Sequence, residues 1–101
     1  MSVDILIVDD EKNIRDILAS VMNDEGYNAR VASNSDEALS EFNKINPSVV
    51  ILDVWLNNSK MDGVEILSEF KSINKDVPVI MMSGHGTVDM AVLATKKGAY
   101  D

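Results

Sequence analysis

Two short apolar runs that both end on aspartate constrain the fold of this chain more than any other feature. The first run covers residues 3–8 and leads into Asp9 and Asp10, and the second covers residues 49–52 and leads into Asp53. Short runs with little polar alternation are typical of strands buried on both faces of a parallel sheet. The carboxyl ends of such strands form the ligand-binding crevice of an open parallel sheet. The sequence therefore predicts three carboxylates in one crevice.

Strands and helices are predicted to alternate along the chain. The expected strands cover residues 3–8, 27–31, 48–52 and 77–82. The expected helices run after Asp10 to Gly26, from Asn34 to Pro47, from Gly63 to Ile73 and from Thr87 to Gly98. Strict alternation predicts an α/β fold, a doubly wound parallel sheet with helices on both faces and right-handed crossovers. No repeat or linker interrupts the pattern, so the 101 residues are expected to form one domain.

Local patterns add detail to these elements. Apolar residues at helical spacing form a stripe within residues 14–22, which predicts a helix with one core-facing side. Alternating polar and apolar residues in 27–31 predict a strand that is exposed on one side, near a sheet edge. Asn34 with Glu37 three residues later resembles a capping box. Asp62 is interpreted as a helix cap rather than a metal ligand.

Composition excludes several classes of function. A net charge of −8 with scattered Lys and Arg argues against nucleic acid as the partner of this segment. No apolar run approaches the roughly 18 residues of a membrane span, and no secretion signal is recognisable. With no cysteine and one histidine, His85, the chain offers neither a disulfide framework nor a zinc site. These features fit a cytoplasmic protein.

The predicted cluster of carboxylates favours metal and phosphate chemistry. Three crowded acids raise one another's pKa unless a cation neutralises them. Mg²⁺ takes oxygen ligands and usually keeps waters that a phosphate can displace. A carboxylate can also act as a nucleophile and form an acyl phosphate. The site is therefore expected to take Mg²⁺ and a phosphoryl group.

Four motifs give the chain a resemblance to a known family. They are Val8-Asp9-Asp10-Glu11, Leu52-Asp53, Met82-Ser83-Gly84-His85-Gly86 and Lys97-Gly98-Ala99-Tyr100-Asp101. In this order they resemble the receiver domain of bacterial two-component response regulators, and most closely the nitrogen-regulation subgroup (NtrC/NtrX type). The resemblance implies a flavodoxin-like, CheY-like fold with strand order 2-1-3-4. Residues 1–101 would be a receiver domain that is incomplete at the C-terminus, since the family's fifth strand and helix would follow.

The resemblance also implies residue roles. Asp53 would be the phosphoacceptor, and it would bind Mg²⁺ together with Asp10 and the backbone carbonyl of Trp55. Asp9 would act on the metal through bound water. The hydroxyl of Ser83 would bind the phosphoryl oxygens and report the switch. The family's conserved lysine would be absent from this chain.

Partners follow from the same resemblance. A sensor histidine kinase would supply the phosphoryl group, and the switch would control a sigma-54-type transcription regulator through AAA+ and DNA-binding output domains absent from this chain. The domain would signal by changed contacts and would not be an enzyme. The apolar strand at 77–82 would form a sheet edge, which predicts self-association as a dimer through that edge or the adjoining helix.

The chain departs from the family pattern after Asp53. The family usually has proline four residues after the acceptor and glycine eight after it, whereas this chain has Asn57 and then Gly63. The loop is therefore two residues longer and more polar. Metal ligation is expected to survive, because Trp55 precedes the insertion.

Three alternatives remain, two from the residues themselves and one from the family resemblance. A Mg²⁺-dependent phosphohydrolase would use a similar acid cluster, but it would want a general acid where Trp55 stands. A nucleotide- or flavin-binding module is disfavoured because the loop after the first strand, Asp9 to Lys12, is not glycine-rich. A pseudo-receiver would bind partners without being phosphorylated, and the missing lysine keeps that alternative open.

Overall fold

The structure, a computed structural model, describes residues 3–82. Its elements, in chain order, are β1 (Asp4–Val8), α1 (Lys12–Asp24), β2 (Asn28–Ala32), α2 (Ser35–Lys44), β3 (Val49–Asp53), α3 (Gly63–Ile73) and β4 (Val79–Met82). The four predicted strands and the first three predicted helices are confirmed, with bounds that shift by a residue or two. The predictions for Ser83, the loop around His85 and the helix after Thr87 lie outside the described residues.

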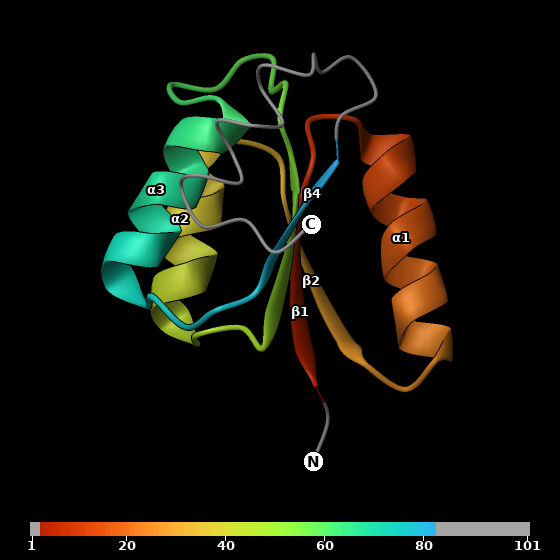
Figure 1. Cartoon of the computed structure of the whole chain (residues 1–101). Helices are drawn as coiled ribbons and strands as arrows, with labels where there is room; N and C mark the ends of the chain where they lie inside the picture. Colours follow the sequence, from red (N-terminus) through yellow and green to blue (C-terminus); the bar gives the residue numbers. More distant parts are fainter. Residues whose placement is uncertain (1–2, 83–101) are drawn as a thin grey trace.

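The four strands form one parallel sheet in the order β2-β1-β3-β4, as predicted. In Figure 1 the helices α2 and α3 lie on one face of the sheet and α1 lies on the other, which confirms the doubly wound arrangement. β2 is an outer strand, as its alternating sequence predicted. The carboxyl ends of β1 and β3 lie side by side, since Val8 pairs with Leu52.

The face under α2 and α3 holds a closed core. Phe42 of α2 and Phe70 of α3 stack with ring centroids 4.3 Å apart and are fully buried. Leu6 and Val8 of β1 and Leu52 of β3 join them at 0 % exposure. Burying a side chain of this size stabilises a fold by about 1.5–3 kcal/mol, so this layer contributes most of the hydrophobic stabilisation.

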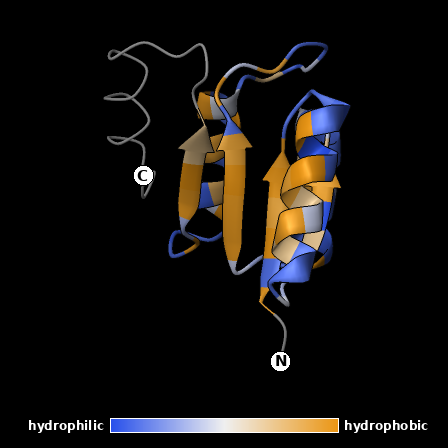
Figure 2. Cartoon of the chain, turned by 90° about the vertical axis from the view of Figure 1, so that its right-hand side faces the viewer, coloured by the Kyte–Doolittle hydropathy of each residue, from blue (hydrophilic) through white to orange (hydrophobic). Residues whose placement is uncertain are grey.

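On the opposite face, the described helix α1 covers the sheet only partly. Ile5, Ile7 and Ile51 form its small core, against which part of the α1 stripe packs. No residue of α1 is fully buried, and Ile17 and Val21 are 60 % and 49 % exposed. The stripe was predicted to face the core, and Leu18 and Met22 do pack there, whereas Ile17 and Val21 remain exposed. Figure 2 shows hydrophobic strands beside α1 with no described helix in front of them.

The side chains of β2 correct the simple reading of its alternation. The polar residue Arg30 is half-buried, while the apolar Val31 is 43 % exposed. Arg30 faces α2, where its guanidinium bonds the Asp4 carboxylate at 2.7 Å and donates to the Glu41 carbonyl at 2.6 Å. Val31 pairs with Ile7 on the sparsely covered face. Among the described elements, the more exposed side of β2 is therefore the one that faces α1, although its side chain there is apolar.

The end of α1 and the start of α2 are fixed by hydrogen bonds between residues close in sequence. α1 ends in a Schellman arrangement in which Gly26, at φ +90°, donates to the Asn23 carbonyl and Tyr27 donates to Met22. Asn34 caps α2 by accepting from the Glu37 N–H, but the box is half formed, because the Glu37 carboxylate accepts from Ser33 instead. None of the helices in residues 3–82 has the length and apolar character needed to cross a membrane.

The capping prediction for the third helix is confirmed. The Asp62 side chain accepts from the Glu65 N–H at 2.9 Å, and the Glu65 carboxylate accepts from the Asp62 N–H at 3.1 Å. A complete capping box satisfies two helix N–H groups at once. It fixes the start of α3 beside the end of β3, where the aspartates lie.

Candidate functional site

The three strand-end aspartates come together at the carboxyl end of the sheet, at the top of Figure 1. Asp9 and Asp10 follow β1, and Asp53 is the last residue of the neighbouring strand β3. Each carboxylate offers an oxygen, and these oxygens all lie within 4.8 Å of one another. The arrangement follows directly from pairing two parallel strands that both end on acids.

Asp9 is the most enclosed of the three, with 5 % of its surface exposed. Its carboxylate accepts the Glu11 N–H at 2.8 Å, and its main-chain carbonyl accepts from the Arg15 guanidinium at 2.9 Å. Burial raises the pKa of Asp9, and the neighbouring Asp10 and Glu11 add to the rise, whereas the Glu11 N–H opposes it. Arg15 was not singled out in the sequence, since nothing local links it to the acids.

Asp53 lies partly buried at the centre of the cluster. Its carboxylate accepts the Trp55 N–H at 3.2 Å. Burial raises the pKa of Asp53 to about 6, and the negative charges of Asp9, Asp10 and Glu11 contribute further, against the lowering effect of the Trp55 N–H. The ionised form of the Asp53 carboxylate is therefore disfavoured at this position.

The donor set fits a hard divalent cation. The cluster offers carboxylate oxygens and no nitrogen or sulfur ligand, which suits Mg²⁺ or Ca²⁺ rather than zinc or copper. Burial is the main cause of the raised pKa of Asp53, and the negative charges of Asp9, Asp10 and Glu11 add to it. An ion among these oxygens would relieve the repulsion.

The loop between β3 and α3 is closed at its base. The Gly63 N–H donates to the Val54 carbonyl at 2.9 Å. A Cβ at Gly63 would lie 2.0 Å from the Asp53 carbonyl oxygen, so only glycine permits this approach. This close approach holds the start of α3 against the end of β3. The sequence showed the Asp-Gly pair but not that the glycine packs on the Asp53 backbone.

The loop also reaches two distant parts of the chain. The Asn57 N–H donates to the Asp10 carboxylate at 3.0 Å. The Ser59 hydroxyl accepts the N–H of Ser35, which is buried at the start of α2, at 2.9 Å. The side chain of Trp55 is 41 % exposed. Ser83, the remaining predicted site residue, lies outside the part of the chain that the structure describes.

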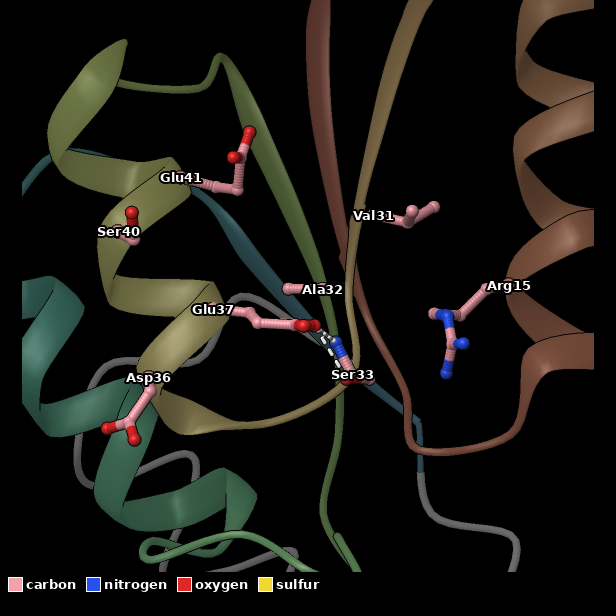
Figure 3. Close-up of a pocket in the computed structure, with 8 residues that line it drawn as sticks. All are labelled: Arg15, Val31, Ala32, Ser33, Asp36, Glu37, Ser40 and Glu41. Atoms are coloured by element: carbon pink, nitrogen blue, oxygen red, sulfur yellow. Dashed lines mark hydrogen bonds between the residues drawn. The ribbon is translucent and has the colours of Figure 1, made fainter.

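A separate hollow of about 560 Å³ lies between α1 and α2 beside the end of β2. Arg15 enters it from α1, and Asp36, Glu37 and Glu41 line it from α2 (Figure 3). Hydrogen bonds from the Ser33 hydroxyl and N–H hold the pKa of Glu37 below its usual range. Its charged groups are already paired locally, and the hollow does not contain the three aspartates.

Comparisons with known proteins agree on one family. The family model for the response regulator receiver domain matches residues 5–101. The nitrogen assimilation regulatory protein NtrX of Azorhizobium caulinodans is 48 % identical over 101 residues, which is all of this chain and 22 % of that protein. This chain thus spans about a fifth of the length of such relatives.

Solved structures give the same result at the level of the fold. The crystal structure of the NtrX receiver domain from Brucella abortus superposes with a TM-score of 0.92 at 47 % identity, covering 97 % of this chain and 82 % of that one. The beryllofluoride-activated NtrC4 receiver domain, solved as a dimer in solution, gives a TM-score of 0.87 at 39 % identity, covering 97 % and 79 %. CheY-like receiver domains share the fold as well.

Proposed function

We propose, from the premise that this chain belongs to the response regulator receiver family, that Asp53 accepts a phosphoryl group and that the chain signals by the resulting change in its contacts. The observation that carries the proposal is the convergence of three carboxylate oxygens within 4.8 Å at the ends of β1 and β3. Asp53 is the candidate acceptor because Asp9 is more enclosed and because Asp53 occupies the acceptor position of the family that the sequence resembles.

The proposed reaction is a phosphoryl transfer to a carboxylate. One oxygen of Asp53 forms a bond to phosphorus while the bond between phosphorus and the donor atom breaks, and the electron pair of that bond leaves with the donor. The product is an acyl phosphate on Asp53. The Trp55 N–H, which bonds one oxygen of Asp53 at 3.2 Å, orients the carboxylate and leaves the other oxygen as the nucleophile.

We propose Mg²⁺ as the cofactor. Asp10, Asp53 and the backbone carbonyl of Trp55 would hold it, with Asp9 acting through a bound water. When bound, it neutralises the negative charge that builds up during transfer. The buried Asp9 is held beside the site by its hydrogen bond from the Glu11 N–H. The Ser83 hydroxyl is the proposed partner of the added phosphoryl oxygens.

The biological setting is proposed from the family. A sensor histidine kinase in the cytoplasm would donate the phosphoryl group, and the domain would be its substrate rather than an enzyme. Output would pass to a sigma-54-type transcription regulator of nitrogen metabolism. Self-association as a dimer is supported by the dimer formed by the activated NtrC4 receiver. The strand β4, with Ile80 37 % exposed, or the helix adjoining it is the proposed contact.

An intact-mass measurement tests the acceptor. The chain is incubated with Mg²⁺ and a small acyl-phosphate donor, beside the variant Asp53→Asn and a sample with chelator in place of Mg²⁺. We expect one phosphoryl adduct on the wild type and none on either control. Consumption of the donor without an adduct would favour the phosphohydrolase. An untouched donor with a folded chain would favour the pseudo-receiver.

A further inference from the structure

We infer that the main-chain N–H of Asn57 positions Asp10 for the cation, so that the long loop between β3 and α3 sets the metal affinity of the acidic cluster. The inference rests on the proposed metal site and adds a positioning residue to it. Asn57 donates to the Asp10 carboxylate at 3.0 Å across 47 residues of sequence. It thereby ties the β1 end of the site to the segment that follows β3.

Each aspartate of the cluster accepts a main-chain N–H, but the donors differ in kind. Asp9 and Asp53 bond the N–H two residues ahead, from Glu11 and Trp55 respectively. These local turns form wherever the chain leaves its strand. The donor to Asp10 is the distant Asn57. The orientation of Asp10 therefore depends on where the loop is held, whereas the other two carboxylates are oriented by their own strand ends.

The loop is anchored on the C-terminal side of Asn57. At its base the Gly63 N–H bonds the Val54 carbonyl at 2.9 Å. At its tip the Ser59 hydroxyl accepts the N–H of Ser35, the first residue of α2, and donates to the Met61 carbonyl at 2.7 Å. These bonds hold the loop on the C-terminal side of Asn57 and so help to keep its amide beside Asp10.

A donor at this position requires a residue other than proline. Proline has no N–H and could not bond Asp10, and proline is the usual residue four places after the acceptor in the family that the sequence resembles. With Asn57 in its place, one oxygen of Asp10 accepts the amide and the other remains available to an ion. Outer hydrogen bonds of this kind orient a ligand, and losing one typically weakens metal binding 10–100-fold.

A pair of variants at one position tests the amide itself. Asn57→Pro removes the N–H, and Asn57→Ala keeps it while removing the side chain. Mg²⁺ is titrated against the fluorescence of Trp55, the single tryptophan of the chain, which is next but one to Asp53. We expect the dissociation constant for Mg²⁺ to rise about 10-fold or more in Asn57→Pro and to stay near the wild-type value in Asn57→Ala.

A third variant tests the anchoring without touching the cluster. Ser59→Ala removes the bonds to Ser35 and Met61 but leaves the Asn57 amide in place. It is expected to weaken Mg²⁺ binding by a smaller factor than Asn57→Pro. If circular dichroism shows that Asn57→Pro does not fold, the Mg²⁺ affinity of Ser59→Ala tests the inference instead.

Hydrogen exchange of the Asn57 amide gives a readout that needs no substitution. If Asn57 positions Asp10, the Asn57 amide should be protected from hydrogen exchange in the free protein and should remain protected when Mg²⁺ is added. Faster exchange with Mg²⁺, or unchanged Mg²⁺ affinity in Asn57→Pro and Ser59→Ala, would overturn it. A wild-type chain that does not bind Mg²⁺ at all would instead contradict the proposed metal site.

Discussion

Within residues 3–82, the two faces of the sheet are covered very differently. On the α2 and α3 face, Phe42 and Phe70 stack at 4.3 Å and both are fully buried. On the α1 face, Ile17 is 60 % exposed and no residue of α1 is fully buried. The acidic cluster lies where these two layers meet, at the carboxyl ends of the strands they share.

This difference separates the part of the molecule that holds the fold from the part that is open. Hydrophobic stabilisation scales with the apolar area removed from water, so the free energy of unfolding should depend on α2 and α3 far more than on α1. The acid-bearing strand β3 is also locked to α3 through Gly63. The position of Asp53 should therefore depend on the closed face, and mutations on the two faces should separate these effects.

The largest effect is expected when one large side chain is truncated to alanine on each face of the sheet. Phe70→Ala removes a stacked, fully buried ring and should lower the free energy of unfolding by about 3–5 kcal/mol. Ile17→Ala removes a side chain that is 60 % exposed and should change it by about 0.5 kcal/mol or less. Urea unfolding followed by circular dichroism measures both. Similar losses for the two variants would mean that the α1 face is covered in solution.

The next effect is expected at the contact between α3 and the Asp53 backbone. Gly63→Ala places a Cβ 2.0 Å from the Asp53 carbonyl oxygen, so α3 must move, at a cost of about 3 kcal/mol or more. Mg²⁺ binding should weaken as well, because Asp53 shifts. The matched control is Gly26→Ala, which meets nothing within 4 Å but keeps a positive φ. It should cost about 1–2 kcal/mol and leave Mg²⁺ binding unchanged. Equal Mg²⁺ binding in both variants would contradict the role given to Gly63.

Much of the fold was predictable because it depends on patterns that act locally. The buried strands, the alternation with helices, the Gly26 end of α1 and the Asp62 cap of α3 each follow from a few neighbouring residues. The exposure of the α1 stripe was not predictable in this way. Periodicity identifies an apolar side of a helix, but how much of that side is covered depends on elements elsewhere in the chain.

The contacts of the site also fall into those that local sequence predicts and those that it does not. That Asp9, Asp10 and Asp53 meet follows from two strands that end on acids and pair in parallel. The Asn57 bond to Asp10 spans 47 residues, and the Gly63 approach depends on how a long loop closes. Neither contact leaves a periodic signal, since each depends on tertiary geometry. The sequence showed only that Asn57 and Gly63 depart from the usual family pattern.

A smaller effect is expected at the edge strand β2, where a charged residue lies on the closed face. Arg30→Met leaves the Asp4 carboxylate and the Glu41 and Ile45 carbonyls without their guanidinium donor. The expected loss is about 2 kcal/mol in the free energy of unfolding. Val31→Thr, on the open face, should change it by about 0.5 kcal/mol or less. If Val31→Thr lowers the free energy of unfolding as much as Arg30→Met does, then side-chain polarity rather than coverage by helices determines how much β2 contributes to stability.

The smallest expected effect has the opposite sign and arises from the site itself. Burial raises the pKa of Asp53 to about 6 from 3.8, so the folded state holds the proton more tightly than the unfolded state does. The contribution of Asp53 to stability is therefore fully present below pH 3.8 and is lost as the pH rises through about 6. Above that pH the ionised carboxylate destabilises the fold.

Asp53→Asn should accordingly stabilise the chain near pH 8 in the absence of divalent cations. The full shift corresponds to about 3 kcal/mol, which solvent access reduces to about 1–2 kcal/mol. The gain should fall to roughly half near pH 5 and disappear below the unfolded pKa. Urea unfolding at each pH measures it, and added Mg²⁺ should narrow the gap by binding the wild type more tightly. If the stabilisation by Asp53→Asn does not vary with pH, then ionisation of the Asp53 carboxylate does not destabilise the fold.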